Sequence, residues 1–319
     1  MKNILAYLFK ITDIILLPFL FFSGLIMKFY RTVGSKRLTT STNLLKKIGV
    51  FPIRDHYYEP LFKNNSLNLS FKRNLPGINL NIEKQIKFLD NLIYQSDFET
   101  FINDQKNLTD KISFKLSNNF FSYGDAEFLF NFIRYTKPQN IIEVGSGEST
   151  KVMSAAITFN QKEILKTINH VCIEPFEHKW LENFSSISLE RKKIEELNLD
   201  LFQNLTSGDL LFIDSSHIIR PQGDVIFELL EIIPSLKKGV YVHIHDIFTP
   251  HDYPEHWLKK WVTFWNEQYL LESTLSNNSS YEIIASLNYL KKNNFNYLQN
   301  VCPSLQEDSE PSSFYFQVK

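Results

Sequence analysis

Cysteine is scarce in this sequence, and its two copies, Cys172 and Cys302, form neither a CxxC pair nor the spacing of a zinc site. Such sparse use suits a reducing compartment. We expect Cys172, in the apolar run HVCIE, to be a small core residue. A strong net charge is also lacking, because the formal net charge is −1. Bulk charge therefore gives no reason to expect a nucleic-acid partner.

Charge is missing altogether from Ile14–Met27, the most hydrophobic stretch. As a helix it would cover about 21 Å, less than the ~30 Å hydrocarbon core of a bilayer. Extension back to Ile4 gives sufficient length but includes Lys10 and Asp13. We favour a membrane helix that spans or partly enters the bilayer and is kinked by Pro18. The alternatives are a buried core helix and a cleaved signal peptide, although no small-x-small cleavage site follows the apolar run.

Basic residues follow this stretch, namely Lys28, Arg31, Lys36, Arg37, Lys46 and Lys47. By the positive-inside rule they place the remainder of the chain in the cytoplasm. We therefore predict a membrane-associated protein whose main domain is cytoplasmic. The same basic run could contact anionic lipid or form a solvated linker.

Residues 38–75 are mixed and rich in turn-forming residues. The segment FPIRDHYYEPLF, residues 51–62, is expected to be ordered and extended, and His56–Pro60 could cover a pocket or pack against the main domain. Residues 80–105 have apolar side chains at helical spacing. SYGDAEFLFNFIRYTKP, residues 122–138, predicts another helix that ends before its proline.

From Asn140 onward, short apolar runs alternate with helical patterns. Strands are predicted at residues 140–144, 169–174, 187–192, 209–214, 239–246, 281–287 and 312–319. Helices are predicted between them at residues 147–160, 175–184, 223–236 and 254–269. This alternation is typical of an α/β fold with a mostly parallel sheet covered on both faces. No clear helix separates the last two strands, so one of them should be antiparallel.

The stretch NIIEVGSGEST, residues 140–150, places a carboxylate and two glycines at the end of the first predicted strand. In an open α/β sheet, ligands bind beyond the carboxyl ends of the strands, near the switch point. Glycine lets the backbone approach a ligand closely, and Ser149 or Thr150 can cap the following helix. We therefore expect a ligand at Glu143, Gly145, Ser146 and Gly147.

This ligand is not expected to be a dinucleotide. The fingerprint G-x-G-x-x-G needs a third glycine where Thr150 stands, and Glu143 would repel a pyrophosphate. The same carboxylate would favour a cation, and S-adenosylmethionine carries a sulfonium and an ammonium group and no phosphate. Glu174, which ends the next strand, is placed to accept hydrogen bonds from a ribose diol. A nicotinamide-dependent oxidoreductase is therefore disfavoured.

A family resemblance is carried by four segments, IIEVGSGEST, CIEP, GDLLFIDSSH and VHIHDIFTPHDYPEHW. Residues 120–250 resemble the class I S-adenosylmethionine-dependent methyltransferases. They look most like the branch of macrocin-type sugar O-methyltransferases and cephalosporin hydroxylase-like proteins. The resemblance covers a little under half of the chain. It implies a Rossmann-like, mostly parallel sheet of seven strands with the last strand antiparallel, here preceded by a hydrophobic helix and a helical extension.

The resemblance also implies a cofactor lying across Glu143, Gly145, Gly147 and Glu174. Ser149 stands where many relatives have a third glycine, and a serine fits there if only its backbone faces the cofactor.

Methyl transfer to a hydroxyl requires an aligned acceptor and a base. We predict His245 as that base, oriented by Asp246 or Asp214, and Asp214 is also a candidate cofactor contact. His243, further inside the same strand, is expected to be a core histidine, and His217 could brace the next loop. The loop after this strand adds other polar candidates, of which the histidines could simply be exposed: His251, Asp252, Tyr253 and His256.

A magnesium ion is an alternative to a histidine base. Some related sugar O-methyltransferases hold one with carboxylates at these two strand ends, and Asp214, Asp246 and Asp252 could supply oxygen ligands. Such relatives often have paired acidic residues after the fifth strand, where this chain has His245 and Asp246. We therefore predict no resident metal and keep Mg²⁺ as the alternative.

Together these observations predict an S-adenosylmethionine-dependent O-methyltransferase that acts on a small-molecule or lipid-linked glycan acceptor at the cytoplasmic membrane face. Residues 1–37 would form the membrane-associated helix and its basic flank, 38–119 a helical cap, and 120–319 the catalytic domain. One alternative is an N-methyltransferase, against which the DSSH after the fourth strand counts. The other is a non-catalytic scaffold or binding protein that keeps the fold. No oligomeric state is predicted.

Overall fold

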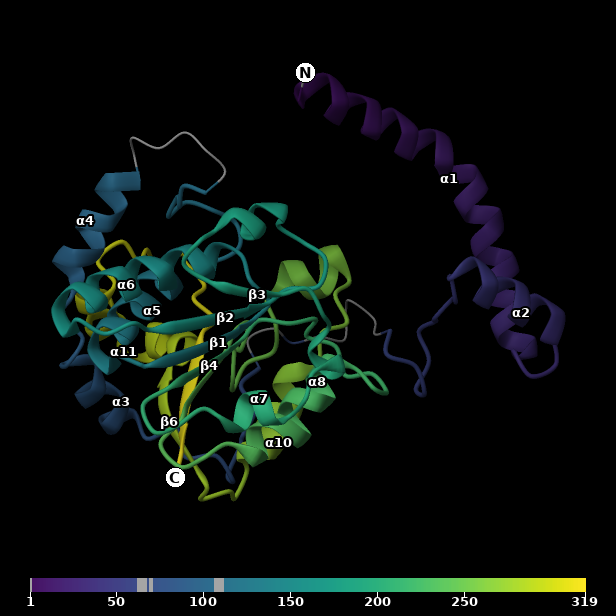
Figure 1. The fold of residues 1–319 in the computed structure, drawn as a ribbon. Coiled ribbons are helices and arrows are strands. Elements are labelled where there is room, and N and C mark those ends of the chain that lie inside the picture. Colours follow the sequence, from purple (N-terminus) through teal and green to yellow (C-terminus); the bar gives the residue numbers. More distant parts are fainter. Residues whose placement is uncertain (1, 62–67, 69–70, 106–111) are drawn as a thin grey trace. The chain divides into compact units, whose positions relative to one another are not determined.

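The computed structural model describes residues 2–61, 68, 71–105 and 112–319. Phe62, the last residue of the predicted extended segment, lies outside the described residues. The chain divides into two compact units, residues 1–68 and residues 69–319 (Figure 1).

The first unit contains one long apolar helix, α1 (Lys2–Val33), and a short helix, α2 (Thr39–Ile48). Helix α1 continues through Pro18 and bends along its length (Figure 1). Its part Leu5–Val33 is, among the described residues, the one helix that by length and composition could cross a membrane. None of its most apolar stretch is buried inside the molecule, so α1 is not packed as a core helix.

The segment after α2 is tied to α1 within this unit. Glu59 forms ion pairs with Arg31 of α1 at 2.7 Å and with Arg54 at 2.9 Å. The Glu59 carboxyl is slightly exposed, and although burial raises its pKa, these arginines lower it further, so the net shift is downward. Tyr57 and Tyr58 remain exposed.

The second unit is built on one sheet, and all seven predicted strands are present in it. The sheet order is β3-β2-β1-β4-β5-β7-β6. Strand β7 is antiparallel to both β5 and β6, and the other pairings are parallel, as predicted. The strands are β1 (Asn140–Val144), β2 (Asn169–Ile173), β3 (Ser188–Glu190), β4 (Leu210–Ile213), β5 (Tyr241–Ile244), β6 (Tyr281–Ser286) and β7 (Phe314–Val318).

Helices cover both faces of this sheet (Figure 1). One face carries α3 (Ile82–Leu89), α4 (Gln95–Gln105), α5 (Asp125–Thr136), α6 (Glu148–Ile164) and α11 (Leu287–Val301). The other carries α7 (Asp200–Gln203), α8 (Asp224–Phe227), a π-helical turn (Glu228–Ile232), α9 (Ile233–Ser235) and α10 (Glu267–Leu275). Short 3₁₀ turns lie at Lys179–Asn183 and Ile194–Glu196, and a second π-helical turn lies at His256–Trp261.

Two predicted helices are largely wrong. Residues 175–184 form only the short 3₁₀ turn, because the Glu174 carboxylate accepts the N–H groups of Phe176 and Glu177 and so holds a tight turn there. Residues 254–269 hold the π-helical turn, which ends at Trp261 because Val262 has a φ of +55°, and the next helix starts only at Glu267. A helix, α11, also lies between β6 and β7, where none was predicted.

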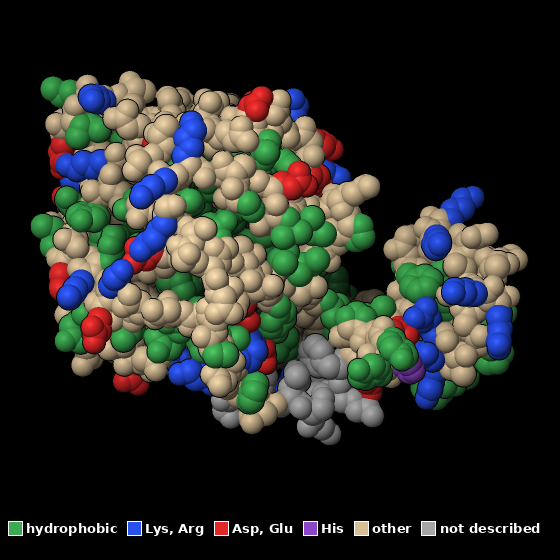
Figure 2. Space-filling model, turned by 90° about the horizontal axis from the view of Figure 1, so that it is seen from below, with side chains coloured by type: hydrophobic (Ala, Val, Ile, Leu, Met, Phe, Trp, Pro, Cys, Tyr) green, Lys and Arg blue, Asp and Glu red, His purple; other side chains and the backbone are tan. Residues whose placement is uncertain are grey.

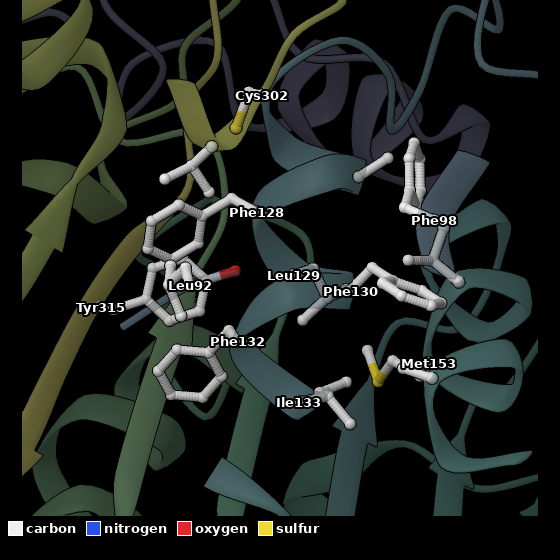
Figure 3. Close-up of a cluster of buried hydrophobic side chains, with 14 of the residues drawn as sticks. Leu92, Phe98, Phe128, Leu129, Phe130, Phe132, Ile133, Met153, Cys302 and Tyr315 are labelled. Atoms are coloured by element: carbon white, nitrogen blue, oxygen red, sulfur yellow. The ribbon is translucent and has the colours of Figure 1, made fainter. Parts of the chain in front are cut away.

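Phenylalanine fills much of the core on the α5 face (Figure 3). Phe128 and Phe132 of α5 each lie 4.9 Å, between ring centroids, from Tyr315 of β7. Phe130 points to the other side of α5 and lies 5.3 Å from Phe98 of α4. Helix α5 is therefore held against the sheet and against α4 at once, which fixes its first residue, Asp125, relative to β5 and β7.

Candidate active site

A cavity of about 590 Å³ opens at the carboxyl ends of β1, β2 and β4. The sheet order reverses between β1 and β4, where ligands of open α/β sheets bind. Its volume falls within the ~300–1,000 Å³ of small-molecule sites. It is lined by residues 144–149, 173–178, 193–195 and 214–217, with Phe120, Phe121, Arg220, Asp224 and Trp265.

Gly145 fixes the loop after β1. Its φ is +76°, and its N–H donates to the carbonyl of Ile173 at 3.0 Å. A Cβ atom at this position would lie 1.8 Å from the carbonyl oxygen of Asp214. The Asp214 N–H in turn donates to the carbonyl of Val144 at 2.9 Å. The ends of three strands therefore meet at a position where no side chain fits.

Glu143 lies beneath the glycine loop, outside the residues that line the cavity. One of its oxygens, Oε1, accepts hydrogen bonds from the hydroxyls of Ser149, at 2.7 Å, and Thr150, at 3.0 Å. The other, Oε2, lies 2.9 Å from His170 Nε2 and 3.2 Å from the Cys172 thiol. Burial, and then the Glu143 charge, raise the pKa of that thiol, so it stays protonated and can donate. Glu143 thus anchors the loop to α6, and its direct contact with a cofactor stays a prediction.

The other predicted loop residues line the cavity. Ser146, Gly147 and Ser149 surround the N-terminus of α6, and the Gly147 N–H donates to the Thr150 hydroxyl at 2.9 Å. Because the Ser149 hydroxyl is donated to Glu143, the Ser149 side chain is turned away from the cavity. At Ser149, where many relatives have a third glycine, it is therefore the backbone that faces the cavity.

Glu174, at the end of β2, lines the cavity and presents a carboxylate of fixed orientation. Its Oε1 accepts the N–H groups of Phe176, at 2.9 Å, and Glu177, at 2.8 Å. The Arg191 guanidinium holds the same turn by donating to the carbonyls of Glu174 and Glu177, at 3.0 and 2.7 Å. Among the described residues, no hydrogen bond to Oε2 of Glu174 is found, so this oxygen can accept one from a ligand.

Five side chains meet beside the cavity and are here called the histidine–carboxylate cluster: Asp214, His217, His245, Asp246 and Glu267. His217 Nε2 lies 3.3 Å from Asp214 and 3.5 Å from Asp246, and its Nδ1 lies 2.9 Å from Glu267. His245 Nδ1 lies 3.6 Å from Asp214 and 3.5 Å from Asp246. Of the five, Asp214 and His217 line the cavity.

The cluster carries more acidic groups than histidines, and this sets its charge states. Burial acts to lower the pKa of His217, but the bonds to Asp214 and Glu267 outweigh it and raise that pKa well above the usual value. At Asp214 burial acts to raise the pKa, but His245 and His217 lower it further, so the net shift is downward. Burial raises the pKa of Glu267 and that of Asp246. Both histidines therefore favour the cationic form, and Asp214, which lies within 3.6 Å of each of them, favours the anionic form.

His245, the predicted base, is enclosed by acceptors on both ring nitrogens. On the side away from Asp214 its Nε2 lies 3.6 Å from Asp125 and 3.3 Å from the Ser312 hydroxyl. Burial acts to lower the pKa of His245, but Asp246 and Asp214 raise it well above the usual value. The two histidines are equally buried, but His217 lines the cavity and His245 does not, so the geometry favours His217 and the role of His245 as base stays a prediction.

Glu267 should control the protonation of His217. In a Glu267→Gln variant the amide oxygen can still accept the Nδ1–H, but the negative charge is gone. We expect the pKa of His217 to fall, because the imidazolium loses a neighbouring anion. Titration of ¹⁵N-labelled imidazole by nuclear magnetic resonance checks this, with the His217 signal assigned by its loss in His217→Gln. A parent His217 that titrates at or below the ordinary ~6.5 would contradict the assignment.

The magnesium alternative keeps two of its three predicted ligands. Asp214, His217 and Asp246 offer ligand atoms that all lie within 4.8 Å of one another. Asp252 lies elsewhere, because its carboxylate pairs with Arg73 and accepts the Tyr269 hydroxyl at 3.0 Å. The set fits a divalent cation in composition, and Mg²⁺ binding stays a prediction.

The remaining predicted histidines lie outside the cavity lining. His243 is fully buried, stacked at 4.0 Å on Phe212, and burial lowers its pKa well below the usual value, so it is a core histidine as expected. His251 is half-buried and His256 is exposed. The backbone carbonyl of His217 accepts the N–H groups of Asn266 and Glu267 and so links this loop to the start of α10, whereas the predicted bracing of the next loop by His217 stays a prediction.

Three residues of the site were missed. Glu267 lies 50 positions after His217, and the position of Asp125 in the sequence predicts only the start of a helix. Trp265 lines the cavity with its ring 4.3 Å from the His217 ring. An acidic residue at the start of a predicted helix was the one available signal for Asp125, and it indicated capping rather than a site.

Residues 142–247 match a family model described as a methyltransferase domain. This range contains the glycine loop, Glu174 and the ends of β4 and β5. The matched residues lie within the seven-stranded sheet with its antiparallel β7, and this part of the chain is an S-adenosylmethionine-dependent methyltransferase domain.

Individual relatives are distant. An uncharacterized protein of Archaeoglobus fulgidus is 29% identical over 134 residues, which cover 40% of this chain and 58% of that protein. The chain thus spans less than two thirds of the length of that curated relative.

Solved structures are more distant still. An O-methyltransferase from Bacillus cereus in complex with SAH has 12% identity and a TM-score of 0.37, over 70% of this chain and 91% of that one. The plantazolicin methyltransferase BpumL, in complex with a triazolic desmethylPZN analog and SAH, has 11% identity and a TM-score of 0.36, over 75% and 97%. Similarities of this size do not by themselves define a class.

Proposed function

We propose that this protein transfers a methyl group from S-adenosylmethionine to a hydroxyl oxygen, with His217 as the base that removes the hydroxyl proton. The main support for this proposal is that His217 Nδ1 pairs with the buried Glu267, while His217 lines the cavity beside Asp214. Glu267 fixes which nitrogen is free to take a proton and stabilises the imidazolium that results.

The cavity residues fit the proposed cofactor. Bound there, S-adenosylmethionine would supply a methyl group on a positively charged sulfur that leaves as a neutral thioether. Oε2 of Glu174 would accept a hydrogen bond from a ribose hydroxyl. The glycine loop allows close approach of the ligand to the backbone, and Asp214 lines the cavity beside His217, where it would face the sulfonium.

Because of the charge of the histidine–carboxylate cluster, His217 would act as a base only when the cofactor is bound. Its raised pKa makes it a cation in the structure described. A cation held beside Asp214 would lower that pKa, because a neighbouring like charge disfavours the imidazolium. Deprotonated His217 would then accept the acceptor's proton at Nε2 as the hydroxyl oxygen attacks the methyl carbon.

For the acceptor we propose a sugar or a lipid-linked glycan precursor at the cytoplasmic membrane face, as in the macrocin-type sugar O-methyltransferase branch. The exposed, apolar α1 supports membrane attachment, and the basic residues after it support a cytoplasmic second unit. Aromatic rings in the cavity lining support a sugar, since Phe120 and Phe176 are 78% and 74% exposed.

Cofactor binding tests the first part of this proposal. Glu174→Ala should weaken S-adenosylmethionine binding roughly 10- to 100-fold, because a hydrogen bond to a charged group contributes about 1.5–3 kcal/mol. Calorimetric titration of the detergent-solubilised full chain, with and without Mg²⁺, measures this. Glu231→Ala, on an exposed position outside the cavity, is the matched control. No binding by a folded parent would favour the scaffold alternative.

Transfer itself can be followed with methyl-labelled S-adenosylmethionine and membranes of cells that lack the active protein. Label in the glycolipid fraction that resists alkaline hydrolysis would support a methyl ether on a sugar. Label released by alkali indicates an ester, and label on an amine would replace O-methylation by N-methylation.

A further inference from the structure

A surface at the end of α1 takes no part in the proposed methyl transfer. Residues 34–53 carry four cations, Lys36, Arg37, Lys46 and Lys47, and no acidic residue. All four are exposed, and none forms an ion pair with any described residue. Figure 2 shows Lys and Arg side chains gathered on this smaller unit, seen from the side on which α1 ends.

Apolar side chains are exposed on the same surface. Leu44 and Ile48, one turn apart on one face of α2, are 57% and 63% exposed. Val50 and Phe51 follow at 57% and 42%. On the helical projection Lys47 flanks this apolar face, and Lys46 and Asn43 lie on the other side of α2, so that α2 has an apolar and a polar side, as in helices that lie in a membrane interface.

Helix α2 is held close to the end of α1. Its Thr42 hydroxyl lies 2.5 Å from the Tyr30 hydroxyl, and Leu45 and Tyr30 are both buried. The Arg31 guanidinium lies 5.0 Å from the centre of the Phe51 ring. The four cations and the apolar side chains therefore occupy a fixed place beside the last turn of α1.

The length of α1 places this surface at headgroup depth. Leu5–Val33 has 29 residues, or about 44 Å of helix, while the hydrocarbon core is ~30 Å thick. The last turns, with Lys28, Tyr30 and Arg31, then reach the interface, where aromatic and basic residues gather. Only five residues separate α1 from α2, so α2 lies at the same depth.

We propose that residues 34–53 form a headgroup platform that binds anionic lipid. Leu44, Ile48, Val50 and Phe51 enter the boundary of the acyl chains, and the four cations contact lipid phosphates. Each Lys or Arg near such a surface contributes roughly fivefold in affinity. The platform rests on the membrane location in the proposed function, and it adds a lipid preference.

Fluorescence quenching by brominated lipid tests the platform in the full chain. Both native cysteines are buried, so a thiol-reactive fluorophore reports on an introduced cysteine. The variants are Ile48→Cys on the apolar face, Asn43→Cys on the opposite face as the matched control, and Leu16→Cys within α1. Liposomes contain phosphatidylglycerol and phosphatidylcholine in a constant ratio, and only the lipid that carries bromine differs.

We expect strong quenching at position 48, little at 43, and at least about twofold more from brominated phosphatidylglycerol than from brominated phosphatidylcholine at position 48. A variant that combines four substitutions should remove this preference for phosphatidylglycerol: Lys36→Gln, Arg37→Gln, Lys46→Gln and Lys47→Gln. Quenching at 16 without quenching at 48, or equal quenching by the two lipids, would overturn the platform alone. A label at 16 that brominated lipid does not quench would overturn the membrane location and the platform with it.

Discussion

His217→Ala is expected to lower the rate of methyl transfer by roughly 10²–10⁴-fold, the usual contribution of a positioned base. The variant removes the one histidine of the histidine–carboxylate cluster that lines the cavity. S-adenosylmethionine affinity should change much less, because the glycine loop and Glu174 are untouched. Single-turnover transfer from methyl-labelled S-adenosylmethionine to membranes of cells that lack the active protein measures the rate, and calorimetric titration of the cofactor measures its affinity.

The matched comparison is His245→Gln, which changes the histidine that the sequence indicates as the base. His245 lies behind Asp214, between that residue and Asp125. We expect its loss to cost less transfer than the loss of His217, and to act through the position of Asp214. A severe loss in His245→Gln with near-normal transfer in His217→Ala would return the base to His245. Thermal unfolding of both variants shows whether either of them has a folding defect.

Gly145→Ala should be among the most damaging single substitutions in the second unit. The new Cβ would lie 1.8 Å from the Asp214 carbonyl oxygen, and alanine would have to adopt a φ of +76°. Since the overlap is with backbone, no side chain can move to relieve it. We expect a loss of more than about 4 kcal/mol in the free energy of unfolding, or a fall in melting temperature of about 10 °C or more.

Gly147→Ala provides the control in the same loop. There φ is −171°, and the nearest atom to an added Cβ is His178 Nε2, at 3.3 Å, on a partly exposed side chain. This substitution should lower the melting temperature by only a few degrees. Equal melting of parent and Gly145→Ala would show that the loop after β1 relaxes more freely than the structure indicates.

Much of the sheet was predictable, because its strands are short apolar runs with clear boundaries. The run at 140–144 became β1 with the same limits, and burial on both faces leaves such a run few alternatives. Helix α11 was missed because its buried side chains, among them Leu290 and Leu298, are spread through an Asn- and Lys-rich segment. Residues 254–269 were misjudged because Trp257 packs on Trp265 and Tyr253 rather than on a regular helix.

The site was predictable where it depends on strand ends. Gly145, Glu174 and Asp214 each directly follow a strand, and parallel strands bring their carboxyl ends to one edge. The partners of the histidines were not predictable, because Glu267 and Asp125 come from distant parts of the chain. Sequence spacing also does not reveal which of two neighbouring histidines lines the cavity. That depends on the φ of +60° at His217, which turns it into the cavity beside Trp265.

The place of β7, between β5 and β6, has a consequence for the order of folding. Until residues 314–318 insert, β5 has an unpaired edge and β6 has no strand to join. Asp125 receives the N–H groups of Ser312 and Ser313 only after this insertion. The Nε2 side of the His245 ring, which faces Asp125 and Ser312, therefore becomes enclosed in the same step that closes the sheet. A chain in which β7 has not inserted would lack the Ser312 contact of His245 and the hydrogen bonds that Asp125 accepts beside it.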